Sequence, residues 1–132
     1  MDANILFSAA KSDGAVRALV KLLLDEGHEC CADAYVVAEA RRNLLDKGAQ
    51  AVQVLDTLLE RLRTTPGLVS GGVAAQVNWL PPKDRPVLAA AIRLGCDALV
   101  TGDRKHFGSA CGQQIGGVSI HSPRSLAEAV LG

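Results

Sequence analysis

The sequence has few aromatic residues, no excess of either charge and no long apolar segment. Aromatic residues make up 3% of the 132 residues, so alanine, valine and leucine must fill the core, which favours helices and parallel strands over a β-sandwich. Basic and acidic residues number 14 each, so no overall positive charge attracts nucleic acid. No apolar run approaches the ~18 residues of a membrane span, and no basic segment precedes the first one. We therefore expect a cytoplasmic protein without a signal peptide.

The four cysteines lack the Cys-x-x-Cys spacing of a zinc or redox site. Cys30 and Cys31 are adjacent, which is poor geometry for a bridge between them, so reduced and mostly buried thiols are the simplest interpretation. The length suits one hydrophobic core. We predict a single domain spanning residues 1–132.

Short apolar segments alternate with amphipathic ones, which predicts an α/β fold with a mainly parallel sheet. The strands are expected at Ala3–Ala9, Glu29–Ala32, Leu68–Ser70, Ala98–Thr101 and Val118–His121. The helices are expected at Ala15–Glu26, from Asp33 as N-cap to Asp46, and at Ala49–Arg63, Arg85–Leu94 and Ser125–Leu131.

Four acidic residues lie at junctions of these elements: Asp2, Glu39, Asp84 and Asp103. A right-handed crossover can bring Asp84, which opens a helix, and Asp103, which follows a strand, to the same sheet edge. Two carboxylates ~4 Å apart repel by ~4 kcal/mol at an effective dielectric constant of ~20, so a cluster of four recruits a cation or raises its pKa values. Carboxylates without paired cysteine or histidine suit Mg²⁺ or Mn²⁺ far better than Zn²⁺.

Each acid also has an ordinary structural interpretation when it is taken alone. Asp84 is placed as a helix cap, Asp103 as a turn residue and Glu39 as a surface residue of a helix. Asp97 precedes its strand and so belongs at the opposite sheet edge from Asp103, which makes it structural. Only the four acids together, in this order, predict a metal site.

Four segments contain these acids: Asp2-Ala-Asn-Ile-Leu-Phe-Ser, Ala38-Glu39, Lys83-Asp84-x-x-x-Leu-Ala-Ala-Ala-Ile and Leu99-Val-Thr-Gly-Asp103-Arg-Lys-His-Phe. In their order and spacing the chain resembles the PIN domain family, which includes the VapC-type toxins of prokaryotic toxin–antitoxin systems. The resemblance implies a Rossmann-like, three-layer α/β/α sandwich with a mainly parallel central sheet, and Mg²⁺- or Mn²⁺-dependent hydrolysis of RNA.

The same resemblance implies roles for individual residues. The family's catalytic acids fall on Asp2, Glu39, Asp84 and Asp103, of which the three aspartates are expected nearest the metal and Glu39 is expected to hold or orient a water. Asn4 matches the small polar residue after the first acid, and Thr101 matches the hydroxyl residue before the last.

Arg104 and Lys105, which follow Asp103, could contact RNA phosphates, although a solvated loop is an equally good interpretation. Trp79 is expected to be a packing or dimer residue rather than a base platform. The leucine-rich helix Ala49–Leu62 offers a face for a homodimer.

The function predicted from this resemblance is that of an endoribonuclease, the toxin of a pair in which a small antitoxin covers the acidic site. The alternative is a PIN-like interaction module with little or no hydrolysis. Only Met1 precedes Asp2, so either the chain is shortened at its start, or the first strand begins later and Asp2 is loosely held. A phosphoacceptor aspartate is a weaker third interpretation, because no lysine follows Lys105 to serve as its partner.

Overall fold

The computed structural model describes residues 1–65, 77–82, 84–103, 107 and 112–131. The chain divides into two compact units, residues 1–66 and 67–132, which are described here one at a time. None of the helices in these residues is long and apolar enough to span a membrane.

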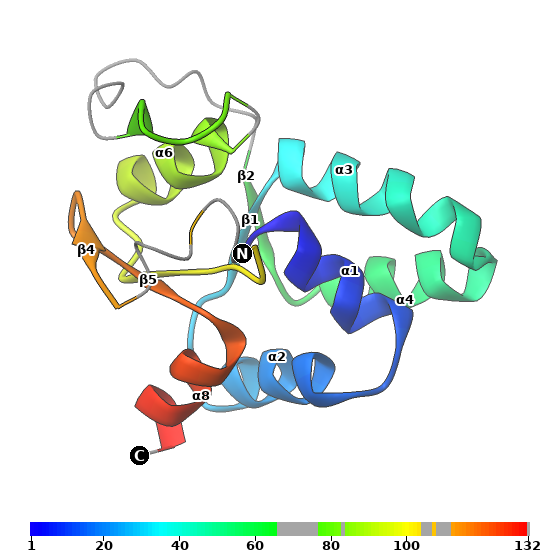
Figure 1. Ribbon diagram of the computed structural model, residues 1–132. Helices are drawn as coiled ribbons and strands as arrows, with labels where there is room; N and C mark the ends of the chain where they lie inside the picture. Colours follow the sequence, from blue (N-terminus) through cyan, green and yellow to red (C-terminus); the bar gives the residue numbers. More distant parts are fainter. Residues whose placement is uncertain (66–76, 83, 104–106, 108–111, 132) are drawn as a thin grey trace. The chain divides into compact units, whose positions relative to one another are not determined.

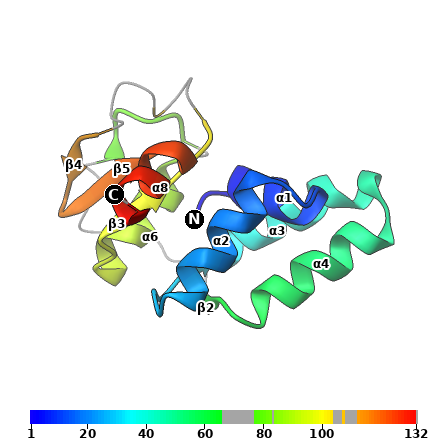
Figure 2. The same cartoon turned by 90° about the horizontal axis from the view of Figure 1, so that it is seen from below.

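The N-terminal unit is mainly helical and has α1 at its centre (Figures 1 and 2). It contains α1 (Ala3–Lys11), α2 (Ala15–Asp25), β1 (Cys31–Asp33), α3 (Ala34–Leu44), the short 3₁₀ helix η1 (Leu45–Lys47), α4 (Ala49–Leu59) and β2 (Arg63–Thr65). Helix α1 packs against α2, α3 and α4. Leu6, Leu44 and Leu55, one from each of three helices, are fully buried in its core.

The first apolar segment is a helix, so the strand predicted at Ala3–Ala9 is wrong. Its buried side chains include Ala3, Leu6 and Ala10, a spacing of three and four residues that places one face against the neighbouring helices. The segment is rich in alanine, the best helix former, and Asp2 caps its first turn. An apolar run of this length does not by itself distinguish a buried strand from a buried helix.

The helix predicted at Ala49–Arg63 ends earlier, as α4 stops at Leu59 and residues 63–65 form β2. Strands β1 and β2 are parallel, with Asp33 opposite Thr65 at their carboxyl ends. The ladder begins where the Arg63 N–H donates to the Cys30 carbonyl at 2.8 Å. Tertiary pairing with β1 therefore overrides a helical periodicity that continues in the sequence.

The C-terminal unit holds a three-stranded sheet in the order β3-β5-β4. Its described elements are α6 (Arg85–Leu94), β3 (Ala98–Val100), β4 (Gln114–Ile115), β5 (Val118–His121) and α8 (Pro123–Leu131). Strands β3 and β5 are parallel, with Leu99 opposite Ile120, while α6 packs against β3 and α8 against β5. Leu88, Leu99 and Ile120 are fully buried among these elements.

Two details of this unit differ from the sequence prediction. Strand β4 was not predicted; it pairs antiparallel with β5 through Gly116 and Gly117, whose positive φ angles of 58° and 84° suit a two-residue hairpin turn. Helix α8 starts two residues early because Ser122 and Ser125 cap it reciprocally, each hydroxyl accepting from the other's backbone N–H at 3.0 Å.

The remaining predicted helices and strands agree with the structure to within two residues, apart from Leu68–Ser70, which lies outside the described residues. The α/β class with mainly parallel strands is confirmed.

Candidate functional site

Asp2 is held firmly at the start of α1. Its side chain is 6% exposed, and its Oδ1 accepts a hydrogen bond from the Ala3 N–H at 2.7 Å. The Met1 ammonium donates to the Cys31 carbonyl at 3.0 Å and so ties the segment to β1. The expectation that Asp2 is loosely held is therefore wrong. An acidic residue at the N-cap also interacts favourably with the helix dipole.

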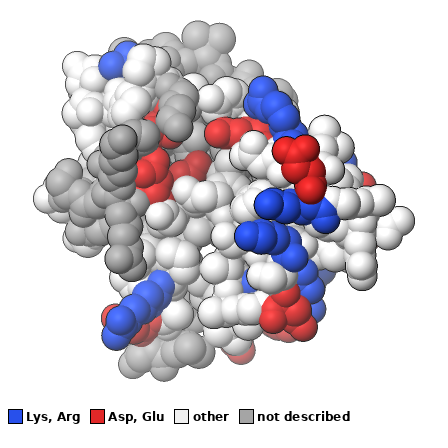
Figure 3. Space-filling view, turned by 45° about the vertical axis from the view of Figure 1, so that its right-hand side comes forward, with Lys and Arg blue, Asp and Glu red and all other residues white. Residues whose placement is uncertain are grey.

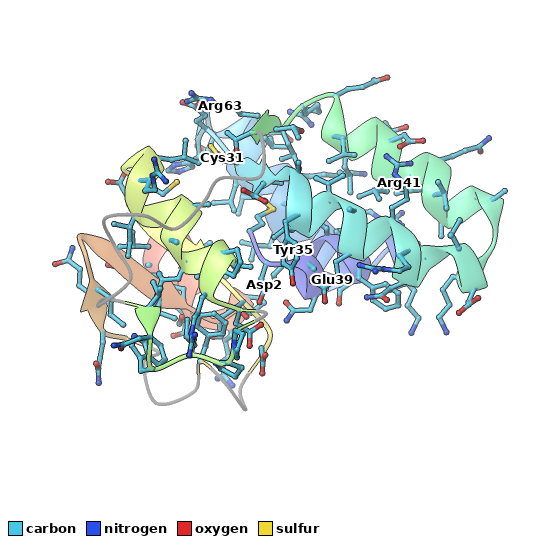
Figure 4. All side chains as sticks on the ribbon, turned by 90° about the horizontal axis from the view of Figure 1, so that it is seen from above. Asp2, Cys31, Tyr35, Glu39, Arg41 and Arg63 are labelled. Atoms are coloured by element: carbon cyan, nitrogen blue, oxygen red, sulfur yellow. The ribbon has the colours of Figure 1, made fainter. Side chains whose placement is uncertain are left out.

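Glu39 lies on α3, which packs against α1, the helix that Asp2 caps. Figure 4 labels Asp2 at the start of α1 and Tyr35 and Glu39 on the first half of α3, two helices that pack against each other. Tyr35 and Glu39 are one helical turn apart, and Asp33 caps the same helix by accepting from the Tyr35 N–H at 2.7 Å. Glu39 is half-buried, as its predicted position at the margin of the apolar face requires. Asn4, also half-buried, lies in the first turn of α1.

Asp84 is a buried carboxylate at the N-cap position of α6. It is 7% exposed, and its backbone N–H donates to the Pro81 carbonyl at 2.9 Å. Its side chain makes no capping hydrogen bond to the helix, in contrast to those of Asp2 and Asp33, and its interactions lie elsewhere. The cap interpretation of Asp84 is thus correct for its position in the chain but does not describe what its carboxylate does.

Thr101 positions the backbone of Asp103 at the end of β3. The Thr101 side chain is 2% exposed, and its Oγ1 accepts a hydrogen bond from the Asp103 N–H at 3.0 Å. The Thr101 N–H donates to the His121 carbonyl at 3.0 Å, which continues the ladder one residue beyond β3. Asp103 is half-buried just past the carboxyl end of the strand, and Asp97 precedes the strand at its other end, as predicted.

The structure thus places Asp2 and Glu39 on two packed helices of one unit and holds the Asp103 backbone on Thr101 in the other. The predicted gathering of all four acids remains a prediction. Within the described part of the chain, no three His, Cys, Asp or Glu residues are placed to hold a metal ion. Arg104 and Lys105 lie outside the described residues.

A sequence model of the PIN domain matches residues 1–105, which include all four acids. The chain belongs to the PIN domain family. No curated protein matches the sequence. PIN domains are in general nucleases with an α/β/α fold that use divalent metal ions, so the predicted fold class is confirmed and the chain has the fold of a nuclease.

The chemistry of the acids in this PIN domain fits a hard divalent cation. The aspartates and the glutamate offer only carboxylate oxygens, the ligands that Mg²⁺ and Mn²⁺ prefer. Asp2 and Asp84 are less than one-tenth exposed, and burying a carboxylate is costly unless hydrogen bonds or a cation compensate it. The described residues include Cys30, Cys31 and Cys96, but Cys30 and Cys31 are neighbours in the sequence at the start of β1, and Cys96 belongs to the other unit. The oxygen donors are therefore the better candidates for holding a metal.

The surface of the N-terminal unit carries both charges. Figure 3 shows Lys and Arg side chains interspersed with Asp and Glu over the helices on the right of the view. Arg41 of α3 pairs with Asp56 of α4 at 2.7 Å, and Arg61 pairs with Asp25 at 2.8 Å. Exposed pairs of this kind contribute about 0–1 kcal/mol each. This face of the PIN domain is mixed in charge rather than basic, in keeping with the neutral composition.

Sequence reasoning missed a groove beside α3. It has a volume of about 380 Å³, and it is lined by one face of α3 and by Thr64 of β2. Its polar lining residues are Arg41, Arg42 and Thr64, the others are apolar, and Leu45 is 65% exposed. The sequence signal was available: Ala34, Val37, Ala38, Arg41 and Leu45 recur at helical spacing opposite the core face of α3.

The leucine-rich helix predicted as a dimer face is used inside the unit. Leu55, Leu58 and Leu62 are each at most 8% exposed, and α4 packs against α1 and α3. The leucine face therefore belongs to the core of this PIN domain. Trp79, by contrast, is 41% exposed although its ring packs edge-on against Phe107.

Proposed function

We propose that this PIN domain is an Mg²⁺- or Mn²⁺-dependent endoribonuclease that hydrolyses RNA phosphodiester bonds. The observation that carries the proposal is Asp84, a buried carboxylate at a helix start that does not cap the helix. A protein that needed only a cap here would gain from a capping geometry such as that of Asp33. Asp84 also occupies the position of an acid in the PIN family's motif.

In this proposal Asp2, Asp84 and Asp103 hold the cation, and Glu39 holds and orients the attacking water. The bound cation would lower the pKa of a water and neutralise charge on the phosphate oxygens. Thr101 fixes the backbone of Asp103 through its hydroxyl, and it therefore acts as a positioning residue. Asn4, Arg104 and Lys105 would contact the substrate.

We further propose that the protein is the toxin of a type II toxin–antitoxin pair. A small antitoxin would cover the acidic residues, the toxin would act in the cytoplasm, and it would form a homodimer. The resemblance of the motif segments to VapC-type toxins supports this assignment.

The alternative is a PIN-like interaction module with little hydrolysis. One observation favours it: the Asp2 carboxylate is already engaged as the cap of α1, with its Oδ1 2.7 Å from the Ala3 nitrogen. A carboxylate has several lone-pair sites, however, and one capping bond leaves others for a cation.

The experiment is RNA cleavage by the purified protein, free of any partner, with Mg²⁺, Mn²⁺ or EDTA. Asp84→Asn removes one charge from a site of unchanged shape, and Asp33→Asn is the matched control, because both aspartates are 7% exposed and both occupy helix N-cap positions. Asparagine caps helices as well as aspartate does, so both variants should fold.

We expect metal-dependent cleavage that Asp84→Asn and Asp103→Asn abolish and Asp33→Asn retains. Calorimetry should show Mn²⁺ binding weakened at least tenfold in Asp84→Asn, because even outer-shell partners of a metal are worth about 10- to 100-fold in affinity. An absence of cleavage by a folded protein that binds Mn²⁺ would favour the interaction module. Cleavage that resists EDTA or survives in Asp84→Asn would refute the metal mechanism.

A further inference from the structure

His121 ends strand β5 at the same sheet edge as Asp103. Strands β3 and β5 are parallel, with Val100 opposite His121, so their carboxyl ends lie side by side. The Thr101 N–H donates to the His121 carbonyl at 3.0 Å, and the Thr101 Oγ1 accepts from the Asp103 N–H at 3.0 Å. Two consecutive hydrogen bonds therefore connect the backbones of His121 and Asp103, across neighbouring strands of a sheet that lie about 4.8 Å apart.

The imidazole of His121 contacts the first turn of α8, the helix that follows β5. Its Nδ1 lies 2.9 Å from the Oγ of Ser125, the third residue of that helix. Because α8 begins where β5 ends, this contact holds the half-buried ring at the carboxyl end of the sheet. Ligands of open α/β sheets bind outside the carboxyl ends of the strands.

The hydrogen bonds of Ser125 determine which ring nitrogen of His121 carries the proton. Ser125 donates its hydroxyl proton to the Ser122 carbonyl at 3.2 Å, and its Oγ accepts from the Ser122 N–H at 3.0 Å. Since the hydroxyl has no second proton to donate, its contact with His121 requires Nδ1 to be the donor. In the neutral ring Nε2 then carries a lone pair, and this atom makes no hydrogen bond within the described part of the chain.

A histidine held in this way is prepared to bind a metal ion. Metal-ligating histidines almost always donate their second ring N–H to another group, which fixes the tautomer and raises the basicity of the ligand nitrogen. Ser125 is such a group for His121. First-row transition metals bind imidazole nitrogen, whereas Mg²⁺ is bound by oxygen ligands and water. Mn²⁺ belongs to the first-row series and also suits carboxylates, so it fits a site that offers both donors.

Asp103 is the carboxylate that shares this sheet edge with the Nε2 of His121. Two other acids of the unit are unsuitable, since Asp97 precedes β3 at the opposite edge and Glu128 is paired with Arg124 at 3.2 Å. Asp103 is half-buried just beyond the end of β3. Two protein ligands within one unit are compatible with the finding that no three His, Cys, Asp or Glu among the described residues are placed to hold a metal. Water or further oxygens can fill the other positions of the ion.

We propose that His121 contributes its Nε2 as a nitrogen ligand to the divalent cation at Asp103, and that the site therefore prefers Mn²⁺ to Mg²⁺. This inference rests on the proposed function and deepens it, because that function leaves Mg²⁺ and Mn²⁺ as equal candidates. Ser125 is the positioning residue of His121. The sequence pointed to acids alone, because only the pairing of β5 with β3 brings His121 to the sheet edge of Asp103.

Electron spin-echo envelope modulation of bound Mn²⁺ tests the ligand directly, because it detects a coordinated imidazole nitrogen. The full-length protein is loaded with Mn²⁺ in the absence of RNA and compared with His121→Asn and His28→Ala. Asparagine keeps an N–H donor close to the position of Nδ1, so the contact with Ser125 can persist while the Nε2 ligand is lost. His28 is exposed in the other unit and is the matched control. We expect nitrogen modulation from the wild type and from His28→Ala, and none from His121→Asn.

Calorimetry measures the preference between the two ions. Ser125→Ala leaves the ligand in place but removes the partner of Nδ1, and it should weaken Mn²⁺ binding about 10- to 100-fold. His121→Asn removes the ligand itself and should weaken Mn²⁺ binding at least as much. Binding of Mg²⁺, which depends on the oxygen ligands, should change much less in both variants. Thermal unfolding without metal checks that each variant is folded.

Nitrogen modulation that persists in folded His121→Asn, or that is absent from wild-type protein with bound Mn²⁺, would overturn the nitrogen ligand. Modulation that disappears only in His106→Ala would do the same, because it would assign the nitrogen to His106, which lies outside the described residues. Wild-type protein that binds Mg²⁺ as tightly as Mn²⁺, or binds neither ion, would overturn the preference.

The cleavage assay described above distinguishes this inference from the proposed function. Metal-dependent cleavage without nitrogen modulation would overturn the nitrogen ligand and leave the nuclease. Nitrogen modulation from a protein that does not cleave RNA would retain the ligand and overturn the nuclease.

Discussion

The two buried threonines at strand ends provide a sharp test of how Asp103 is positioned. Thr101 follows β3 and is 2% exposed, and its hydroxyl accepts from the Asp103 N–H at 3.0 Å. Thr65 ends β2 and is 6% exposed, and its hydroxyl has no hydrogen-bond partner among the described residues. Replacing either by valine exchanges one hydroxyl for a methyl group of nearly the same size. The same substitution should therefore have opposite effects at the two sites.

The magnitudes follow from these contacts. Thr101→Val removes a hydrogen bond with a net value of about 0.5–1.5 kcal/mol, and water replaces it poorly because the site is buried. We expect it to lower the free energy of unfolding by about 1 kcal/mol. Thr65→Val removes a buried hydroxyl whose desolvation nothing offsets, and it should raise the free energy of unfolding by up to about 1 kcal/mol. The two variants should thus differ by about 2 kcal/mol.

Urea unfolding followed by circular dichroism measures the two free energies, and the cleavage assay gives the effect on function. Release of the Asp103 backbone should lower cleavage by Thr101→Val about 10- to 100-fold, because a misplacement of about 1 Å can cost about 100-fold in rate. Thr65→Val should cleave at the wild-type rate. If the two variants changed the free energy of unfolding in the same direction, the hydroxyls of Thr101 and Thr65 would not differ in hydrogen bonding as described. Full activity of Thr101→Val despite lost stability would refute its role in positioning Asp103.

Three further predictions concern the scaffold. Asp33→Ala removes the acceptor of the Tyr35 N–H and should cost about 1 kcal/mol in urea unfolding, and an effect near zero would show that the cap contributes nothing. Gly95→Ala places a side chain at φ +70° with no atom within 4 Å of the new Cβ, so only backbone strain of about 1–2 kcal/mol should lower the melting temperature. Burial raises the pKa of the Cys30 thiol; the nearby Met1 ammonium opposes this shift. The folded state therefore disfavours the thiolate. The contribution of Cys30 to the free energy of unfolding should be fully present below about pH 8.5 and should be lost as the pH rises through the higher pKa of the folded state. Alkylation of the native protein should modify Cys30 more slowly than Cys31. A flat stability profile above pH 9, or equal alkylation rates, would contradict this.

Elements with strong local signals could be predicted from the sequence. Helix α6 agrees with its predicted bounds Arg85–Leu94, because an N-terminal proline, a regular apolar spacing and Gly95 in the left-handed region mark both ends. Asp33 was predicted as an N-cap and is one. Strand β5 agrees at Val118–His121, where a short β-branched run alternates between buried and half-buried positions.

Elements defined by their partners could not be predicted in this way. The segment Ala3–Lys11 is a helix because three other helices bury one of its faces, and the sequence alone does not show that those partners are helices. The helical periodicity of α4 runs on to Leu62, yet Arg63, predicted as the last residue of the helix, begins a strand because β1 offers it a ladder. In both cases the tertiary partner decided between two local conformations of similar free energy.

Some features of the candidate site could likewise be predicted from the sequence, whereas others are visible only in the tertiary structure. The order and spacing of Asp2, Glu39, Asp84 and Asp103 lie in the sequence, within the residues 1–105 that the PIN domain model matches. Only the tertiary structure shows that Asp2 is buried as a cap, that Asp84 occupies a cap position without capping, and that Thr101 holds Asp103. Residue order is a property of the chain, whereas burial and hydrogen bonding depend on which atoms the fold brings within about 3 Å of each carboxylate. The sequence by itself determined which side chains are present for the chemistry, and the fold determined which of their atoms are already engaged.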